Sequence, residues 1–276
     1  MAATAPKGSV AVLGAAGRMG TAIIRVMSEL PDLKLTAAVE HDKSDKLGQD
    51  AAQVAQVAGA AGGGGVKIAP GVPVAEAAAV WIDFSSPEAT ARHAAAAAAA
   101  GAALVVGTTG VTAEGKEALA AAARSVPVVF APNTSVGVTV LLRLCAEAAR
   151  LLGPGFDLEI VETHHRRKRD APSGTALRLA EAVAEATGRD LSKDARMVRQ
   201  GDVGPRTPRE IGIQTLRGGD VVGDHTVIFA NVGERVELTH KASSRDTFAN
   251  GALRAAQWLV KQKPGLYDMQ DVLGLK

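Results

Sequence analysis

The sequence predicts an α/β fold in its first half and an α+β fold in its second half. Up to about residue 134, short apolar runs rich in β-branched residues alternate with alanine-rich stretches of helical character. This alternation requires crossover connections, which produce a parallel sheet covered by helices on both faces. From about residue 135, strand-like segments follow one another, which favours a mixed or antiparallel sheet. A chain of 276 residues has room for both domains.

Each element of the first half has a local justification. Pro87 stands where the first turn of a helix tolerates proline. The seven alanines at 94–100 suit a helix that packs closely on a sheet. Strands are expected at residues 10–13, 34–39, 80–84, 104–106 and 128–130, and helices at 18–30, 87–101 and 113–124.

The second half changes character at its first strand. Residues 156–163 alternate apolar Phe156, Leu158 and Ile160 with polar side chains, which is the period of a half-exposed strand. Turn residues at 218–219 and 231–234 then separate three further strand-like runs, which we expect to form an antiparallel series. These strands are expected at 211–216, 220–230 and 235–241, and helices at 138–152, 175–187 and 248–261.

Two domains follow from this pattern. The first is expected at residues 1–134 and the second at 135–244, with 245–276 packing back on the first. The single cysteine, Cys145, excludes an intramolecular disulfide and is interpreted as a buried structural thiol. Residues 1–9 lack the apolar core of a signal peptide, and we find no uninterrupted run of the roughly 18 apolar residues of a membrane span. We therefore expect a cytoplasmic protein that is not bound to a membrane.

The charge balance also limits the partners. The net charge is +2 and aromatic residues make up 3% of the chain. Neither a strongly basic surface nor stacking platforms are therefore expected, and nucleic acid is excluded as the main partner.

A glycine-rich loop joins the first strand to the first helix. It reads Gly14-Ala-Ala-Gly17-Arg-Met-Gly20, with Ala16 at the usual position of the middle glycine. Such glycines let the backbone approach a pyrophosphate at a helix N-terminus. Glu40 follows Gly20 by 20 residues, at the end of the next strand, where an acid can bind the adenosine ribose. The alternative is a purely structural turn, but the combination predicts a Rossmann-like dinucleotide-binding domain.

Two more segments lie just past the carboxyl ends of predicted parallel strands, where open α/β sheets bind ligands. They are residues 107–110, which read Gly-Thr-Thr-Gly, and residues 131–134, which read Ala-Pro-Asn-Thr. Each alone could be an ordinary turn. Together they favour ligand binding.

The most informative segment is residues 159–176, in which a strand delivers His164, His165 and Lys168 before a loop enters a helix. Histidine can give or take a proton near neutral pH, and lysine supplies charge or a proton. Ser173 is positioned to cap the helix, so the Gly174 and Thr175 amides could hold a carboxylate. Adjacent strand residues face opposite ways, so the two histidines are a poor chelating pair and no metal is expected. The remaining basic residues of the run are interpreted as solvated: Arg166, Arg167 and Arg169.

The pattern E-x-x-E-x-H-H-x-x-K-x-D-x-P-S-G-T-A of residues 159–176 resembles the signature of the 4-hydroxy-tetrahydrodipicolinate reductase family, also called dihydrodipicolinate reductases. Two further stretches, at 217–227 and 237–249, are similar to the same family. The resemblance runs from about residue 10 to the end of the chain.

The resemblance implies roles for individual residues. His164 would be the catalytic acid/base and Lys168 a second proton donor, while His165, Gly174 and Thr175 would bind substrate. It also implies a homotetramer built through the sheet of the second domain, and hinge closure between the domains. NADH or NADPH would be held by Gly14, Ala15, Ala16, Gly17, Arg18, Met19, Glu40, His41, Gly107, Thr108, Thr109, Ala131, Pro132, Asn133 and Thr134.

The implied reaction is the reduction of a small cyclic dicarboxylate, the dehydrated imine of 4-hydroxy-tetrahydrodipicolinate, to tetrahydrodipicolinate in lysine biosynthesis. His41 stands where many relatives have arginine, which leaves the choice between NADH and NADPH open. Two other hypotheses remain at this point: a dehydrogenase of another small acid or amino acid, and a module that senses NAD(H) without turnover. The His-His-x-x-Lys and Ser-Gly-Thr combination favours the reductase, because a different substrate would not need it.

Overall fold

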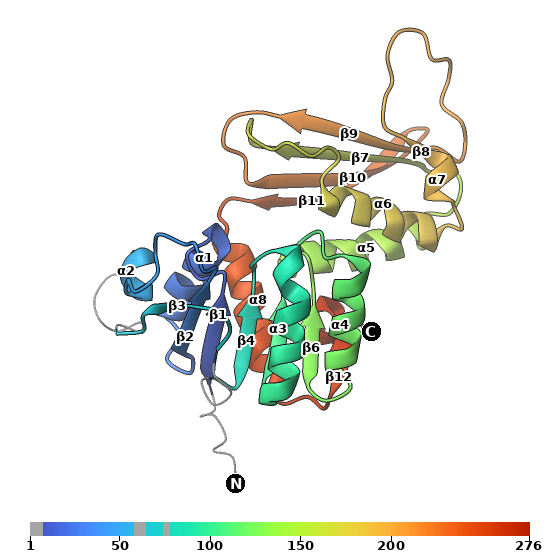
Figure 1. Cartoon of the computed structure of the whole chain (residues 1–276). Helices are drawn as coiled ribbons and strands as arrows, with labels where there is room; N and C mark the ends of the chain where they lie inside the picture. The colour runs from blue at the N-terminus through green and yellow to red at the C-terminus, as the bar shows by residue number, and fades with distance from the viewer. Residues whose placement is uncertain (1–7, 58–64, 74–77) are drawn as a thin grey trace. The chain divides into compact units, whose positions relative to one another are not determined.

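The computed structural model describes residues 8–57, 65–73 and 78–276. The chain divides into two compact units (Figure 1). The first unit combines Met1–Val136 with Arg245–Lys276, and the second is Gly137–Ser244. In the described part of the chain, we find no helix with the length and apolar character needed to cross a membrane.

The first unit is built on a seven-stranded sheet with the order β12-β6-β5-β4-β1-β2-β3. Its paired strands are all parallel. The strands are β1 (Ser9–Leu13), β2 (Lys34–Glu40), β3 (Ile68–Pro70), β4 (Val80–Asp83), β5 (Ala103–Val106), β6 (Pro127–Phe130) and β12 (Gly265–Tyr267). The helices are α1 (Arg18–Met27), α2 (Ala51–Val54), α3 (Pro87–Ala100), α4 (Ala113–Ala122), α8 (Asp246–Leu259) and α9 (Met269–Leu273).

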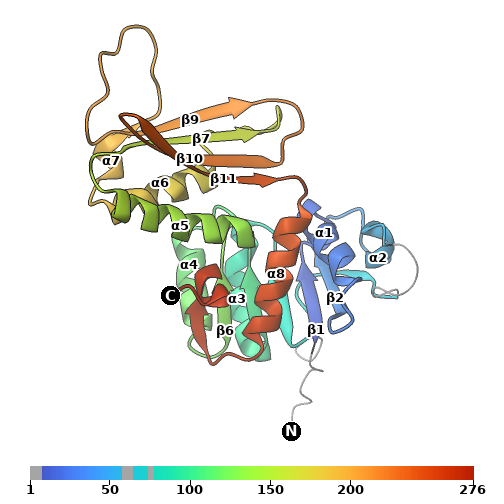
Figure 2. The same ribbon diagram turned by 180° about the vertical axis from the view of Figure 1, so that it is seen from behind.

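The central strand β1 shows that both faces of this sheet are buried. Val10 and Val12 belong to a core cluster shared with α1 and α8, whereas Ala11 and Leu13 belong to a second cluster shared with α3 and α4. Figures 1 and 2 show the two helix layers from opposite sides. Alternate residues of a strand point to opposite faces, so a strand apolar at every position must be covered on both. The predicted parallel α/β sheet is confirmed.

The strand order reverses next to β1. The chain continues from β1 to β2 and β3 on one side, and then crosses to β4, β5 and β6 on the other. In open α/β sheets, ligands bind at the carboxyl ends of the strands where the order reverses. The turns that follow β1 and β4 therefore lie at the expected ligand position.

The main differences from the sequence prediction concern short elements. Helix α1 ends at Met27 rather than at residue 30, because Ser28 closes the last turn and residues 28–29 form turns. Strands β3 and β12 were not predicted. Each has three residues, too few for a hydrophobic period to be recognised, and each lies at an edge of the sheet.

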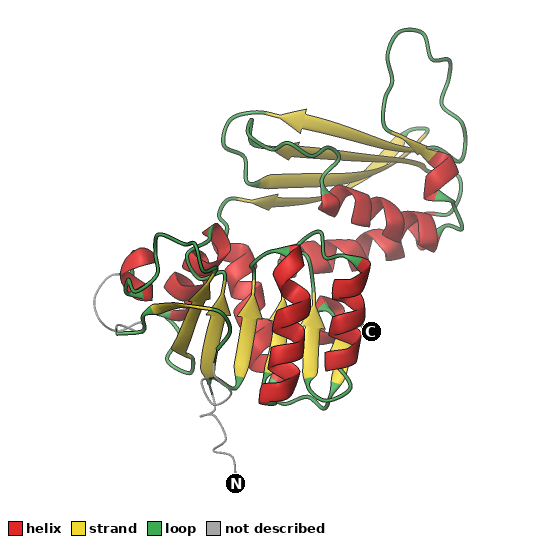
Figure 3. Cartoon of the chain, viewed as in Figure 1, coloured by secondary structure: helices red, strands yellow, loops and turns green. Residues whose placement is uncertain are grey.

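The second unit is built on a mixed five-stranded sheet with the order β11-β10-β7-β9-β8. Its strands are drawn in yellow in Figure 3. Alternate residues of β7 are buried, and its apolar face packs on α5 and α6. The predicted mixed α+β architecture is confirmed. The strands are β7 (Asp157–His164), β8 (Ala195–Arg196), β9 (Ile211–Arg217), β10 (Gly223–Asn231) and β11 (Glu234–Ala242), and the helices are α5 (Val136–Leu152), α6 (Gly174–Ala186) and α7 (Leu191–Asp194).

The predicted antiparallel series was wrong at one position. Strands β10 and β11 form an antiparallel pair, but β9 does not pair with β10, because β7 lies between them. The segment from α6 to β8 makes a crossover that returns the chain parallel to β7, and β9 pairs there. The connection from β9 to β10 then passes around the end of β7. The amide of Gly218 donates to the carbonyl of His164 (2.9 Å), and the amide of His165 donates to Val221 (2.7 Å).

Candidate functional site

The glycine loop of the first unit has the geometry that the sequence predicts. Gly14 has a positive φ of 77°, which favours glycine. A Cβ on Gly20 would lie 2.1 Å from the carbonyl oxygen of Gly14, so only glycine lets α1 start this close to the loop. The amides of Gly14 and Ala15 donate to the carbonyl of Val39 (2.9 and 3.0 Å), which ties the loop to β2.

The N-terminus of α1 lacks a side-chain cap, as does that of α8, whereas three other long helices are capped. Ser86 caps α3, Thr112 caps α4 and Ser173 caps α6 through their side chains. Helix α1 instead begins after Gly17 without a side-chain cap, and its first turn carries no acidic residue. Amides at a helix start attract anions, and an uncapped start leaves them available to a ligand. A pyrophosphate fits this arrangement.

Glu40 lies beside the same loop. Its Oε2 accepts a hydrogen bond from the amide of Ala16 (3.0 Å), and its Oε1 accepts one from the amide of His41 (3.1 Å). The ring of His41 is exposed, and its Nδ1 accepts from the amide of Lys43 (3.2 Å). The structure therefore brings Glu40 and His41 to the glycine loop, where a ribose hydroxyl could replace the Ala16 amide as the partner of Glu40.

The other two predicted loops follow neighbouring strands β5 and β6. The amide of Gly107 donates to the backbone carbonyl of Asp83 (2.9 Å), and a Cβ on Gly107 would lie 2.0 Å from the ring of Phe84. The amide of Ala131 donates to the carbonyl of Val106 (2.9 Å). Thr108 and Thr134 are buried, and the hydroxyl of Thr134 donates to the carbonyl of Phe248 (2.7 Å) in α8. Both turns are therefore fixed at the carboxyl edge of the sheet.

A buried network around Asp83 was missed in the sequence analysis. Asp83 ends β4 and is fully buried, and His93 in α3 approaches its carboxylate with Nδ1 at 3.0 Å. The hydroxyls of Ser85 and Thr108 also contact Asp83, so one carboxylate joins the turn after β4 to the turn after β5. The sequence offered one signal for this network, the acidic Asp83 at the end of a predicted strand. It offered no signal for His93, which lies within an alanine-rich helix.

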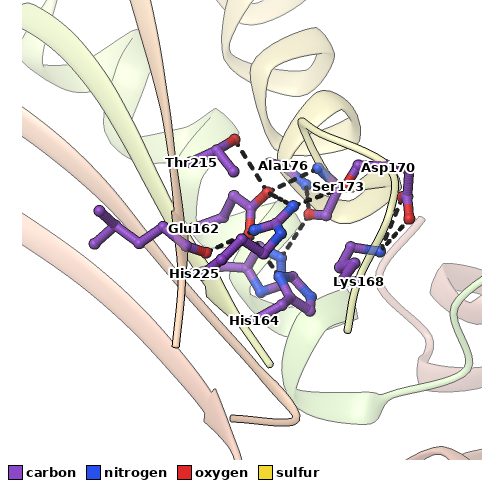
Figure 4. Close-up of polar contacts among 10 residues, drawn as sticks. Glu162, His164, Lys168, Asp170, Ser173, Ala176, Thr215 and His225 are labelled. Atoms are coloured by element: carbon purple, nitrogen blue, oxygen red, sulfur yellow. Dashed lines mark hydrogen bonds and ion pairs between the residues drawn. The ribbon is translucent and has the colours of Figure 1, made fainter. Parts of the chain in front are cut away.

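In the second unit, a buried carboxylate organises the site (Figure 4). Glu162 in β7 has no exposed surface. Arg217 donates to both of its oxygens, from Nη1 to Oε2 (2.8 Å) and from Nη2 to Oε1 (3.0 Å). Oε1 also accepts from the Ser173 amide (3.0 Å) and the Thr215 hydroxyl (3.2 Å). Burial opposes ionisation of Glu162, but hydrogen bonds from Arg217 and His164 outweigh it and lower its pKa.

His164 is oriented by this carboxylate. Its Nδ1 lies 2.6 Å from Oε2 of Glu162. A carboxylate only accepts, so Nδ1 carries the hydrogen and Nε2 is the atom that can take up or release a proton. Burial, with the charges of Lys168 and Arg217, lowers the pKa of His164 against the opposing effect of Glu162. A Cβ on Gly223 would lie 3.0 Å from Nε2, so glycine leaves the space beside this atom.

A second imidazole completes the cluster. His225 packs edge-on against His164, with ring centroids 5.1 Å apart. Ser173 Oγ accepts from the amide of Ala176 (3.1 Å), as the predicted cap of α6, and lies 3.0 Å from Nε2 of His225. Burial lowers the pKa of His225 to about 4, so this ring is neutral near pH 7. Of the first residues of α6, Gly174 is exposed and Thr175 is half-buried, so the helix start is accessible.

The loop after β7 carries the lysine. Lys168 Nζ donates to both oxygens of Asp170 (3.0 and 2.9 Å), and its charge is close enough to lower the pKa of His164. His165 is half-buried, whereas the three arginines of this run are exposed, in agreement with their interpretation as a solvated surface. Among the described residues, no group of three or more histidine, cysteine or acidic side chains is arranged to hold a metal ion.

Three members of this cluster were missed in the sequence analysis: Glu162, Arg217 and His225. For Glu162 a signal existed. The alternation that buries Leu158 and Ile160 also places Glu162 and His164 on the same face of β7. For Arg217 and His225 the only signal was that both lie in the family-like stretch 217–227. Their roles depend on the register of β9 and β10 against β7, where Arg217 lies opposite His164 and His225 lies opposite Glu162.

Comparison with known families agrees with this geometry. Residues 8–134 match the family model described as dihydrodipicolinate reductase, N-terminus, and residues 137–273 match the model of its C-terminus. A 4-hydroxy-tetrahydrodipicolinate reductase of Syntrophotalea carbinolica is 52% identical over 268 residues, covering 97% of this chain and 99% of the relative. The reductase of Anaeromyxobacter dehalogenans is 55% identical over 271 residues, covering 97% and 98%.

Solved structures show the same fold. A dipicolinate-bound dihydrodipicolinate reductase from a Paenisporosarcina species matches with a TM-score of 0.74 and 22% identity, covering 96% of this chain and 99% of that one. An amine dehydrogenase from Mycobacterium smegmatis matches with a TM-score of 0.56 and 12% identity, covering 95% and 94%. Enzymes of different names therefore share this architecture, and the family assignment rests on the sequence matches, which confirm the predicted resemblance.

Proposed function

The chain belongs to the dihydrodipicolinate reductase family and is an oxidoreductase that uses a nicotinamide cofactor, and from this premise we propose how its residues divide the reaction. The substrate is 4-hydroxy-tetrahydrodipicolinate, which is reduced through its dehydrated cyclic imine to tetrahydrodipicolinate in lysine biosynthesis. His164 serves as acid/base and Lys168 as second proton donor. The observation that carries this proposal is a neutral His164 held by buried Glu162, with the ammonium of Lys168 nearby.

The chemistry of the bound nicotinamide is the supply of a hydride. Hydride addition to the ring carbon conjugated to the imine moves an electron pair to nitrogen and leaves an enamine, which must then gain a proton. Nε2 of neutral His164 can take up a proton and then deliver it to the ring, because Glu162 holds the proton on Nδ1 and stabilises the imidazolium that forms. Lys168 supplies positive charge, and a proton, where negative charge develops.

The two substrate carboxylates require donors. We assign one of them to the amides of Gly174 and Thr175 at the start of α6, with His165 as a further contact. Support comes from the cap geometry: the side chain of Ser173 satisfies the Ala176 amide, and the helix start is accessible. Helix α6 has 13 residues, long enough for its dipole to favour an anion at this end.

For the cofactor, we propose that both NADH and NADPH are used, with NADH at least as effective. Glu40 binds the cofactor ribose and repels a 2′-phosphate. His41 offsets this repulsion only weakly, since a histidine lacks the permanent charge of an arginine. The glycine loop and the turns at 107–109 and 131–134 hold the remainder of the dinucleotide.

A homotetramer assembled through the second sheet is a further part of the proposal. The face of this sheet opposite α6 carries Thr226 and Thr239, which pair across β10 and β11 with hydroxyls 3.0 Å apart. Leu216 in β9 is half-exposed, at 53%. Sedimentation of the purified protein tests this assembly, and a monomer at micromolar concentration contradicts it.

The test of the function is a coupled assay. Purified protein is mixed with NADH and a synthase that generates the unstable substrate, and the loss of nicotinamide absorbance is followed. Consumption that depends on the synthase is expected. Binding of NADH without consumption would support a sensing module instead, and turnover only with another small acid would support a different dehydrogenase.

A further inference from the structure

We propose that Arg217 is a positioning residue that joins the two proton-handling side chains, His164 and Lys168, into one geometry. The inference rests on the proposed function for its kinetic part. Arg217 is the last residue of β9 and lies opposite His164 in the register of β7 and β9.

One side of the guanidinium acts on His164 through Glu162. Nη1 and Nη2 each donate to one oxygen of that carboxylate, and the oxygen that receives Nη1 is also the one that holds Nδ1 of His164. Glu162 is fully buried, and an isolated buried carboxylate would take up a proton rather than remain charged. Arg217 therefore keeps Glu162 ionised and aimed at His164.

The other side acts on the loop that carries Lys168. Nη2 donates to the carbonyl oxygen of Asp170 (2.7 Å), and the carboxylate of Asp170 pairs with Nζ of Lys168. A planar fork with five donors can contact a carboxylate and a separate carbonyl at once, whereas an ammonium is a single point charge. Arg217 thus links Glu162, which orients His164, to Asp170, which pairs with Lys168.

The charge of Arg217 also affects proton binding in the cluster. The groups that face His164 are Glu162 from β7, Arg217 from β9, His225 from β10 and Lys168 from the loop. His225 is neutral near pH 7. Removing the positive charge of Arg217 leaves the cluster one charge more negative, so the Glu162–His164 pair should bind its proton at higher pH.

Two variants separate position from charge. Arg217→Lys keeps the charge and loses the fork, so kcat should fall about 100-fold, the size of effect that a misplaced reacting group produces. Arg217→Met loses both. Its Glu162–His164 pair should titrate at higher pH than in the parent, whether or not the variant turns over. Affinity for NADH should stay within about twofold of the parent for both variants, because the cofactor loops belong to the first unit.

The matched control is Arg206→Lys. Arg206 lies in the second unit, where it donates to the carbonyls of Leu158 and Glu210 and pairs with two acidic side chains, Asp157 and Glu159. None of these partners belongs to the Glu162 cluster. This control should leave kcat and the histidine titration unchanged.

The measurement combines histidine NMR titration of carbon-13-labelled protein with kcat and NADH affinity. His164→Ala identifies the signal among the 6 histidines. The proposal is overturned if the His164 signal of Arg217→Met titrates at the same pH as in the parent. It is also overturned if Arg217→Lys retains kcat within threefold of the parent. Because the titration requires no turnover, a parent without reductase activity would refute the proposed function and still leave the link between Arg217 and His164 testable.

Discussion

The cofactor loop of the first unit and the Glu162 cluster of the second are built by different means. The loop uses backbone groups of nearly consecutive residues, and its contacts with β2 span 25 positions from Gly14 to Val39 and 24 from Ala16 to Glu40. The cluster uses side chains that are far apart in sequence, with Arg217 and Glu162 separated by 55 positions and Ser173 and His225 by 52. The first site depends on glycines that have no Cβ where the backbone of the loop approaches the start of α1. The second depends on the charge and direction of individual side chains.

This difference predicts which kind of substitution disrupts each site. A backbone site tolerates changes of side-chain charge, but not an added Cβ where the chain approaches itself. A buried side-chain site tolerates little change of charge, because every oxygen of Glu162 already has a partner. Variants of the two sites should therefore affect different measured quantities.

The largest effect is expected from the proton-handling residues. His164→Ala and Lys168→Ala should each lower kcat by about 10²–10⁴-fold, the usual range for general acid–base groups. Lys168→Arg should restore little activity, because its planar fork cannot place a point charge where the ammonium lies. NADH affinity, measured by fluorescence titration, serves as the control. A marked loss of NADH binding in either alanine variant would break the proposed separation of the two sites.

The next effect is expected at the glycine loop. Gly20→Ala introduces a Cβ 2.1 Å from the carbonyl oxygen of Gly14, so the loop or α1 must move. NADH affinity should fall by about 100-fold, a change of roughly 3 kcal/mol in binding free energy. Gly174→Ala is a matched control, because a Cβ there meets no atom within 4 Å and the residue lies outside the loop. Normal NADH binding by Gly20→Ala would show that the loop does not form the cofactor site.

A smaller effect is expected for the substrate carboxylate. If the hydroxyl of Thr175 joins its amide in binding the carboxylate in both ground and transition states, Thr175→Ala should raise KM about tenfold and lower kcat less. Steady-state kinetics with the coupled synthase measures both constants. An unchanged KM would remove the Thr175 hydroxyl from the carboxylate site.

The smallest effect concerns cofactor preference. His41→Arg adds a permanent charge next to Glu40 and should improve kcat/KM for NADPH several-fold, with little change for NADH. The unmodified enzyme should use NADH at least as well as NADPH. A strong preference of the unmodified enzyme for NADPH would contradict the role given to Glu40.

The same comparison explains what could be predicted from sequence. The parallel sheet and the glycine loop were predictable because hydrophobic period, glycine φ and Cβ crowding are local properties. His164 and Lys168 were singled out by the family resemblance and by their strand-to-helix setting. The position of β9 beside β7 was not predictable, because a crossover through α6 decides it. Arg217 was hidden for the same reason, since only that strand order brings it opposite His164.

The central claim is that His164 and Lys168 act as one proton-handling unit. The most direct test compares kcat of His164→Ala, Lys168→Ala and the double variant, each with folding and NADH affinity verified. Groups that act together lose their function together, so the double variant should be only about as impaired as the worse single variant. A double variant whose loss equals the product of the two single losses would show independent roles. Activity within threefold of the parent for either single variant would remove that residue from the mechanism.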